Sequence, residues 1–139
     1  MSEIASGFGF KVIHCGDNDE RNVLADKYLP SLTDIEEIPN NAPDKYMVIA
    51  TQGVGDVATL ISALSKSPSY VAFVGSRRKF ASYKNKLLDA GIEQEAICNV
   101  HSPAGLDINA VTPEEIALSI MAEIVQCRRS TKIIEALDE

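Results

Sequence analysis

The chain has 139 residues, enough for one domain that buries a core and too few for two. Twenty acidic and thirteen basic residues give a net charge of −7, which argues against nucleic acid as a partner attracted by bulk charge. The longest apolar runs, Tyr70 to Val74 and Met47 to Ala50, are far shorter than the roughly 18 residues that span a bilayer. The first residues lack the basic and apolar regions of a secretory signal, so we expect a cytoplasmic protein without a membrane segment.

The cysteines and histidines give no sign of a metal or catalytic centre. Cys15, Cys98 and Cys127 are far apart and form no C-x-x-C motif, so neither a disulfide framework nor a zinc site is indicated. We expect buried, reduced thiols and no bound metal. His14 and His101 have no carboxylate at a spacing typical of a catalytic base, so we predict structural roles for both, and no catalytic residue is assigned.

Short apolar segments alternate with helical patterns along the chain, which is typical of βαβ units in a parallel sheet. We expect a strand at residues 10–15, followed by a helix at residues 20–28 that ends before Pro30. A weak extended segment at residues 35–38 then leads into a polar loop at residues 39–44.

The middle of the chain contains the clearest strand signals. A strand is expected at residues 46–51, and a helix with apolar residues at helical spacing is expected at residues 56–66. The run Tyr70 to Val74 is apolar at every position, as expected for a strand buried on both faces. The helix predicted next, over residues 79–90, ends at Gly91, the residue type typical of a helix stop.

The last part of the chain contains a loop, a short strand near residues 98–100 and the best-marked helix. Thr112 is a natural N-cap, Pro113 suits the first helical position and Glu115 completes a capping box. The apolar stripe that should pack this helix on the sheet comprises Ile116, Ala117, Ile120, Met121, Ile124 and Val125. We therefore predict an α/β fold, a three-layer Rossmann-like parallel sheet with helices on both faces, formed by residues 1–139 as one domain.

Ligands of open parallel sheets bind at the carboxyl ends of the strands, so the loops after the strands are candidate sites. After Thr51, the glycines Gly53 and Gly55 and the small residue Ala58 fit the G-x-G-x-x-G/A pattern between a strand and a helix. Glycines let backbone amides approach a phosphate, whereas Asp56 at the helix start would repel an anion and could simply cap the helix. A dinucleotide loop and an ordinary tight turn both remain open here.

The turn between the second buried strand and the helix after it carries a stronger signal. It reads Gly75-Ser76-Arg77-Arg78-Lys79 in an otherwise acidic chain. The glycine, the hydroxyl and the three cations offer backbone, side-chain and guanidinium donors together. Cations at the positive end of a helix are unfavourable unless an anion offsets them. We predict that this turn binds a phosphate group, with a solvated basic face as the alternative.

Three segments carry a resemblance to a known family: residues 51–56 (TQGVGD), 70–79 (YVAFVGSRRK) and 101–125 (HSPAGLDINAVTPEEIALSIMAEIV). Within a likeness that extends over residues 8–126, they resemble the carboxyl-terminal domain of the XdhC/CoxI family, most closely its CoxI/CoxF-like members. That family helps to insert or mature the molybdenum cofactor of hydroxylases such as xanthine and carbon monoxide dehydrogenases. The resemblance implies a Rossmann-like domain of a maturation factor, with a molybdopterin-type cofactor or NAD(P) as its ligand.

The chain departs from the pattern of that family near its beginning. Full-length members start this domain with a strand and a glycine-rich turn, and a helix then leads into a segment similar to Gly7-Phe8-Gly9-Phe10. Met1 stands almost at that point here, so we expect the sheet to lack the usual first strand and its turn. The acidic residue that would follow the strand at residues 10–15 is replaced by Gly16, with Asp17 one place on. A second polypeptide that supplies the missing parts is one hypothesis.

The resemblance and the basic turn together predict an accessory protein for a molybdenum hydroxylase of the carbon monoxide or xanthine dehydrogenase type. Its expected partners are a phosphate-bearing small molecule and either the hydroxylase or a companion maturation subunit. The alternative is an NADPH-dependent oxidoreductase, with Gly53 and Gly55 at the pyrophosphate and Ser76, Arg77 and Arg78 at the 2′-phosphate. A further alternative is a structural interaction domain, and an edge strand left unpaired by the missing first strand would favour a homodimer.

Overall fold

The structure is a computed structural model that describes residues 1–16, 25–29 and 44–138. Its elements are α1 (Ser2–Gly7), β1 (Ile13–Cys15), β2 (Lys27–Leu29), β3 (Tyr46–Ile49), α2 (Asp56–Leu64), β4 (Tyr70–Phe73), α3 (Arg77–Ala81), α4 (Lys84–Asp89), α5 (Gln94–Cys98) and α6 (Pro113–Leu137). β1 pairs with β2 and β3 pairs with β4, both in parallel, which confirms the predicted α/β class with parallel strands.

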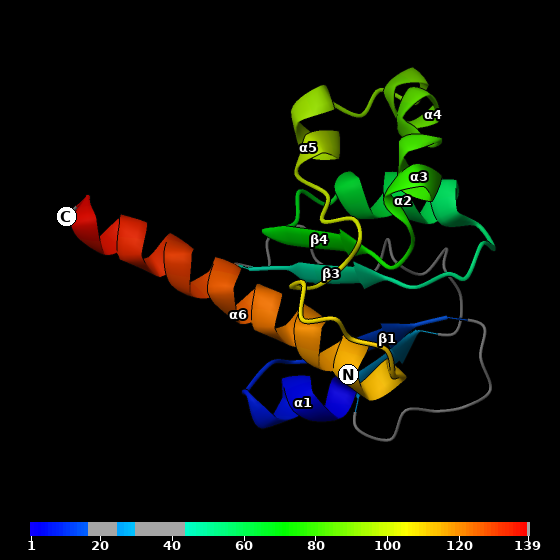
Figure 1. Ribbon diagram of the computed structural model, residues 1–139. Coiled ribbons are helices and arrows are strands. Elements are labelled where there is room, and N and C mark those ends of the chain that lie inside the picture. Colours follow the sequence, from blue (N-terminus) through cyan, green and yellow to red (C-terminus); the bar gives the residue numbers. More distant parts are fainter. Residues whose placement is uncertain (17–24, 30–43, 139) are drawn as a thin grey trace.

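Strand β4 is buried along its whole length because both of its faces are covered. Side chains of a strand point alternately to opposite sides of the sheet. Val71 and Phe73 pack with residues of α2, α4 and α5, whereas Tyr70 and Ala72 pack with residues of α6. Figure 1 shows the resulting layers, with α2 to α5 on one side of β3 and β4 and α1 and α6 on the other. The two-sided burial explains why this segment is apolar at every position.

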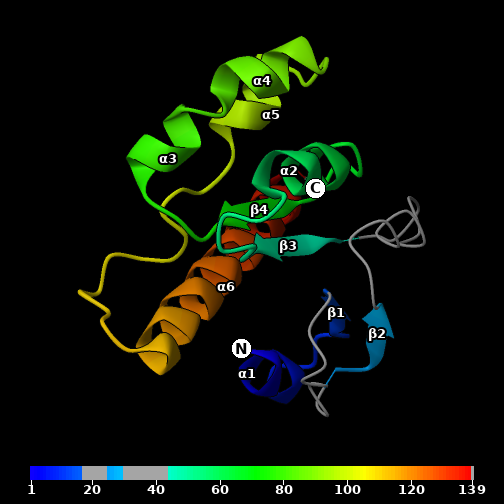
Figure 2. The ribbon, with the colours of Figure 1, turned by 90° about the vertical axis from the view of Figure 1, so that its right-hand side faces the viewer.

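The β1–β2 pair corrects part of the helix predicted at residues 20–28. Lys27 to Leu29 form a strand, aligned in parallel with Ile13 to Cys15, and Leu29 is buried. Pairing with β1 and burial of Leu29 outweigh the weak helical pattern here, as tertiary contacts often outweigh local preference. Figure 2 shows this pair next to α1. The strand predicted at residues 10–15 is present as the shorter β1.

Several elements predicted for the first third of the chain fall on residues outside the described ranges. These are the first part of the helix predicted at residues 20–28, the extended segment at residues 35–38 and the loop that follows it up to residue 43.

The helix predicted over residues 79–90 is instead two short helices, α3 and α4. The backbone N–H of Tyr83 donates to the carbonyl of Phe80, three residues back, which tightens the chain into a turn. The Ser82 hydroxyl donates to a backbone carbonyl within the same turn. Such side-chain bonds compete with regular helical hydrogen bonding, and a helix prediction based on apolar spacing does not register them.

The end of α4 agrees with the prediction. Gly91 has a φ of 86°, and its N–H donates to the Leu88 carbonyl at 2.9 Å, while the Ile92 N–H donates to the Leu87 carbonyl at 3.1 Å. This pair of bonds is the Schellman arrangement that glycine favours after a helix. The short strand predicted near residues 98–100 is wrong, because this segment is the end of α5 and the turn after it.

Helix α6 begins as predicted and runs well beyond the sheet. The Thr112 hydroxyl accepts a hydrogen bond from the Glu115 N–H at 3.2 Å, and Pro113 is the first helical residue. The buried residues of its first half include Ala117, Ile120, Met121 and Ile124. The second half projects from the body of the molecule, as Figure 1 shows. Within the described ranges, no helix is long and apolar enough to cross a membrane.

Candidate functional site

Three connections leave the same edge of the sheet. They follow β3, β4 and His101, whose single parallel bridge to Ala72 extends the sheet by one more segment. Because the paired segments are parallel, their carboxyl ends meet at one edge, where ligands of such sheets collect. The structure thus brings the two predicted loops together and adds a third segment, which begins at His101.

The carboxylate of Asp56 is the centre of the loop after β3. This side chain is only 3% exposed. It accepts hydrogen bonds from the Thr51 hydroxyl, from the Gly53 N–H at 3.1 Å and from the Tyr83 hydroxyl at 2.7 Å, and it pairs with Lys79 Nζ at 3.2 Å. Burial acts to raise the pKa of Asp56, but the hydrogen bonds from Thr51, Tyr83 and Lys79 together lower it below its ordinary value. Asp56 is therefore a buried, charged anchor.

This network favours the tight turn over the dinucleotide loop, which stays a prediction. The Gly53 N–H, which would approach a pyrophosphate, already donates to the Asp56 carboxylate. The Lys79 ammonium forms an ion pair with the same carboxylate. A dinucleotide phosphate at this position would have to displace a buried carboxylate. Gly53 and Gly55 have φ values of 89° and 71°, so backbone conformation alone favours glycine here. Binding of NAD(P) by this loop would require the Gly53 amide to exchange Asp56 for a phosphate.

The basic turn after β4 keeps two of its three cations available. The Ser76 hydroxyl caps α3 by accepting a hydrogen bond from the Lys79 N–H at 3.1 Å. Lys79 is committed to Asp56, whereas Arg77 and Arg78 are exposed and pair with no carboxylate in the described part of the chain. Helix α3 is only five residues long, so its dipole contributes little to the argument for an anion.

Gly75 has a packing role in this turn. A Cβ at this position would overlap the ring of Phe73, so the turn passes too close to β4 for any other residue. Gly75 and Ser76 thus shape the turn, and Arg77 and Arg78 are its two exposed cations without a carboxylate partner among residues 1–16, 25–29 and 44–138.

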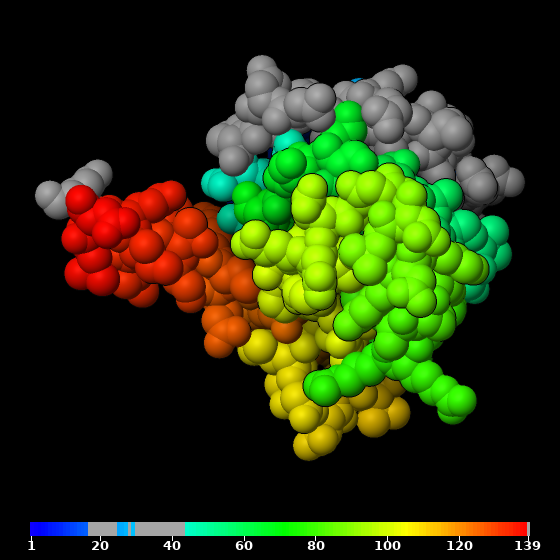
Figure 3. Space-filling view, turned by 90° about the horizontal axis from the view of Figure 1, so that it is seen from above, coloured from blue at the N-terminus to red at the C-terminus, as the bar shows by residue number. Residues whose placement is uncertain are grey.

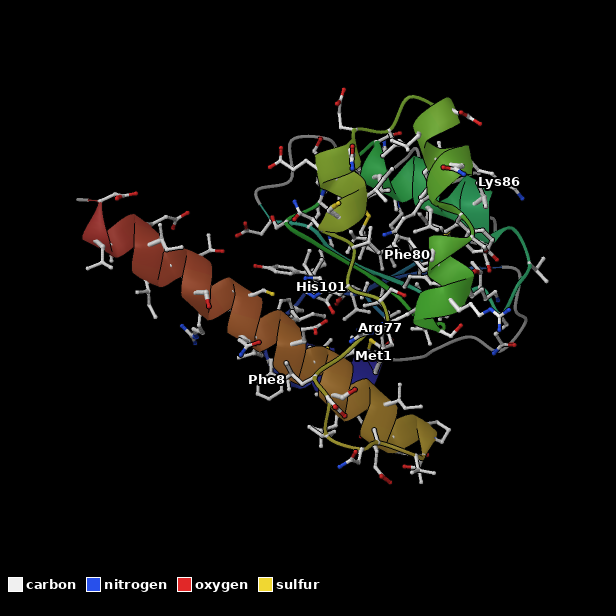
Figure 4. All side chains as sticks on the ribbon, turned by 45° about the horizontal axis from the view of Figure 1, so that its top comes forward. Met1, Phe8, Arg77, Phe80, Lys86 and His101 are labelled. Carbon is white, nitrogen blue, oxygen red and sulfur yellow. The ribbon has the colours of Figure 1, made fainter. Side chains whose placement is uncertain are left out.

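A hollow of about 290 Å³ lies beside this turn. Its lining consists of Arg77, Phe80, Ala81, Lys84, Ile97, Cys98, Val100 and Ser102. Figure 3 shows the molecule from the side of α4 and α5, the side of the sheet on which the hollow lies. Figure 4 labels two of the lining residues, Arg77 and Phe80, on α3. Sequence reasoning did not assign the residues contributed by α4, α5 and the segment after α5. Cys98 is exposed here, which corrects the expectation of a buried thiol, and Cys15 and Cys127 are half-buried.

A second cluster, missed by sequence reasoning, is built around Glu123 of α6. The buried Glu123 Oε1 accepts hydrogen bonds from the Tyr70 hydroxyl at 2.7 Å and the Gly105 N–H at 3.2 Å, and it lies 3.2 Å from His101 Nδ1. The rings of Tyr70 and His101 stack with centroids 4.7 Å apart. Burial, followed by the hydrogen bond to Glu123, raises the pKa of Tyr70 well above its usual value. The cluster fixes the segment after His101 against α6. It also gives His101 a carboxylate neighbour that the sequence spacing did not predict, so the structural role of His101 stays a prediction.

Comparison with known proteins identifies the class. The model of the XdhC Rossmann domain matches residues 1–124. A crystal structure described as a xanthine dehydrogenase from Bacillus halodurans superposes with a TM-score of 0.71 at 27% identity and covers 93% of this chain. The chain therefore belongs to the XdhC Rossmann domain family, and the Rossmann-like fold implied by the resemblance is confirmed.

Two curated relatives agree with this assignment. The protein YqeB of Escherichia coli (strain K12) is 34% identical over 88 residues, which cover 63% of this chain. A protein of Bacillus subtilis (strain 168), named as a probable xanthine dehydrogenase subunit, is 32% identical over 104 residues, which cover 74% of this chain. The chain spans only 16% and 28% of the length of these two relatives and 38% of the superposed crystal chain.

Proposed function

We propose that this chain is an accessory domain for the maturation of a cytoplasmic molybdenum hydroxylase of the xanthine or carbon monoxide dehydrogenase type. Family membership supports the class of protein, and the relative named as a probable xanthine dehydrogenase subunit supports the type of enzyme. The domain acts by holding a phosphate-bearing pterin or nucleotide for the hydroxylase or for a companion subunit. The resemblance to CoxI/CoxF-like members remains part of this proposal.

The observation that carries the ligand proposal is the pair Arg77 and Arg78. Both guanidinium groups are exposed after β4, and no carboxylate in the described ranges pairs with them, although the chain has a net charge of −7. A guanidinium fork matches phosphate oxygens and binds them by two parallel hydrogen bonds. The pterin or nucleotide phosphate is therefore assigned to these two arginines, while Gly75, Ser76 and Lys79 hold the turn in shape.

A dinucleotide is the less favoured ligand. The loop after β3 contains Thr51, Gly53, Gly55 and Asp56. Its Gly53 N–H, which would bind a pyrophosphate, donates to the Asp56 carboxylate instead. Titration of the purified chain with NADPH and with NADH separates the alternatives. Tight binding of NADPH with a strong preference over NADH would support the oxidoreductase instead of the maturation factor.

Mass spectrometry of small molecules that co-purify with the chain tests the proposed ligand. The wild-type chain should release a phosphorylated pterin or nucleotide, and the double variant Arg77→Ala/Arg78→Ala should release much less of it. Lys86→Ala is the matched control, because Lys86 is an exposed cation on the neighbouring helix α4. Equal amounts of the compound from all three chains would overturn the assignment to the arginines.

We also propose that the chain forms a homodimer through the projecting half of α6. Ile133, Ile134 and Leu137 are 59%, 60% and 80% exposed there. The basic residues Arg129 and Lys132 precede them, and Glu135 and Asp138 stand among and after them. Antiparallel pairing with a second copy would bury the apolar residues and set the basic end of each helix beside the acidic end of the other. This charge pattern favours a second copy as the occupant.

A further inference from the structure

The charged residues that line the hollow beside the basic turn are all positive. Arg77 comes from α3 and Lys84 from the start of α4, and both line it. None of its described lining residues is acidic, although acidic residues outnumber basic ones by 20 to 13 in the whole chain. Two cations on the wall of one concave site attract an anion from solution, because low-dielectric walls concentrate their field.

The inner wall of the hollow is apolar and rigid. Phe80, Ile97 and Val100 are 5%, 3% and 8% exposed, and all three belong to the core that covers one face of the sheet. Side chains held in a packed core cannot move aside easily, so the wall has a fixed shape. Little of each side chain is exposed, so a flat ring would meet only the outer edge of this apolar surface, with the cations of Arg77 and Lys84 at the side.

A buried hydroxyl in the same wall has no partner among the described residues. The Oγ of Ser102 is shielded from solvent and makes no hydrogen bond with any of them. Buried polar atoms without a partner are rare, because desolvation without a compensating hydrogen bond is costly. A ligand with a ring nitrogen or carbonyl beside this wall would satisfy it if the Ser102 side chain turned toward the hollow.

We propose that the hollow is the ligand site of the domain and that it takes a single phosphorylated heterocycle of mononucleotide size. The phosphate binds Arg77 and Lys84, the ring lies against Phe80, and a polar ring atom bonds the Ser102 hydroxyl. The volume of about 290 Å³ lies near the lower limit of about 300 Å³ for ligand pockets, which suits a ligand of mononucleotide size. This inference rests on the proposed function only for the phosphorylated nature of the ligand, and of the two arginines it places Arg77 in the hollow.

Guanosine monophosphate is a suitable probe, because it combines a fused heterocycle with one phosphate. Isothermal titration of the full chain should give binding of this probe that is about tenfold tighter than that of guanosine or of inorganic phosphate alone. Binding of phosphate as tight as that of the nucleotide would mean that the apolar wall contributes nothing, and it would overturn the proposal.

The chain offers a matched control for the two cations of the hollow. Arg77→Ala and Lys84→Ala should each weaken binding of guanosine monophosphate by about tenfold. Lys86→Ala should change it by less than about twofold, since Lys86 does not line the hollow and surface charges act weakly at a distance. These three cations are exposed on short helices, and circular dichroism verifies that each variant is folded.

Ser102→Ala and the thiol of Cys98 give independent readouts. Ser102→Ala should weaken the nucleotide more than inorganic phosphate, because it removes a contact to the ring. Bound nucleotide should also slow alkylation of Cys98 by iodoacetamide, with Cys15 and Cys127 as internal controls outside the lining. Unchanged alkylation of Cys98 at saturating nucleotide would place the ligand elsewhere.

The two proposals fail in different ways. If Arg78→Ala weakens binding as much as Arg77→Ala and Lys84→Ala has no effect, the turn alone binds phosphate and the hollow is not the site. Arg77→Ala and Lys84→Ala could abolish nucleotide binding while a molybdenum hydroxylase still matures normally in cells. That result would support the hollow as the ligand site and contradict the proposed role in maturation.

Discussion

Lys79 Nζ lies 3.2 Å from the buried carboxylate of Asp56, so one of the three consecutive cations in the basic turn already has an anion of its own. The ion pair ties the turn after β4 to the loop after β3. The same carboxylate accepts the Gly53 N–H, so Lys79 and this amide both have an acceptor within the fold. At this edge of the sheet, Arg77 and the hollow beside it are therefore the better candidates for binding a ligand.

Asp56→Asn should lower the free energy of unfolding by about 2 kcal/mol at neutral pH, because it breaks a buried, charge-assisted network. The pKa of Asp56 is lowered in the folded state, so the folded chain releases this proton more readily than the unfolded chain. The stabilisation is thus present above the ordinary pKa of 3.8 and is lost as the pH falls through the lower, folded value. Urea unfolding between neutral and acidic pH measures both effects.

The control for this series is Asp107→Asn, which changes an exposed carboxylate in the loop before α6. It should leave the unfolding free energy within about 0.5 kcal/mol of the wild type. An Asp56→Asn chain with wild-type stability and the same acid sensitivity would show that the network contributes nothing.

Glu123→Ala should lower the free energy of unfolding by about 2 to 3 kcal/mol, because it leaves the buried Tyr70 hydroxyl and Gly105 amide without their acceptor. Hydrogen exchange of the Gly105 amide should accelerate more than that of amides in α2, since the loop loses its attachment to α6. Glu114→Ala, on the exposed start of the same helix, should change neither quantity. Unchanged exchange at Gly105 would contradict the anchoring role of Glu123.

Gly105→Ala and Gly91→Ala separate close packing from backbone strain. Both glycines have positive φ, 95° and 86°. A Cβ at Gly105 would overlap the side chain and backbone of Ser119, whereas a Cβ at Gly91 would meet nothing within 4 Å. Thermal unfolding should therefore give a loss of about 1 kcal/mol for Gly91→Ala and of at least about 3 kcal/mol for Gly105→Ala. Similar losses would mean that α6 does not approach Gly105 as closely as described.

Ile134→Asp should convert the proposed homodimer to a monomer, since it places a charge in the apolar stripe of the projecting helix. Leu118→Asp is the matched control, because Leu118 is 53% exposed on the same helix but lies in the half that packs on the sheet. Sedimentation velocity over a range of concentrations measures both. A wild-type chain that stays monomeric throughout, or equal dissociation of the two variants, rules out this interface.

The strands and helix ends that depend on local signals could be predicted from the sequence. The unbroken apolar run of β4 reflects burial on both faces, and Thr112 and Gly91 act as caps through bonds to residues three to five positions away. Strand β2 could not be predicted, because three residues become a strand only through pairing with β1. That residues 1–139 form one domain stays a prediction.

The candidate site was only partly predictable for a similar reason. The basic turn stands out in an acidic sequence, and its position after a strand indicates a ligand. The partner that neutralises Lys79 is Asp56, the first residue of α2 and more than twenty residues earlier, and the hollow needs Ile97 from α5 and Ser102 from the segment after it. Contacts at such separations follow from packing of the sheet layers and leave no local pattern.

The central claim is that the basic turn, through Arg77 and Arg78, holds a phosphate-bearing ligand needed for maturation of a molybdenum hydroxylase. The most direct measurement is hydroxylase activity, together with molybdenum content of the purified hydroxylase, in cells that carry Arg77→Ala/Arg78→Ala in place of the wild-type chain. We predict a parallel loss of activity and bound molybdenum, at unchanged levels of hydroxylase protein and with Lys86→Ala behaving as wild type. Full activity and full molybdenum content in the double variant would contradict the account.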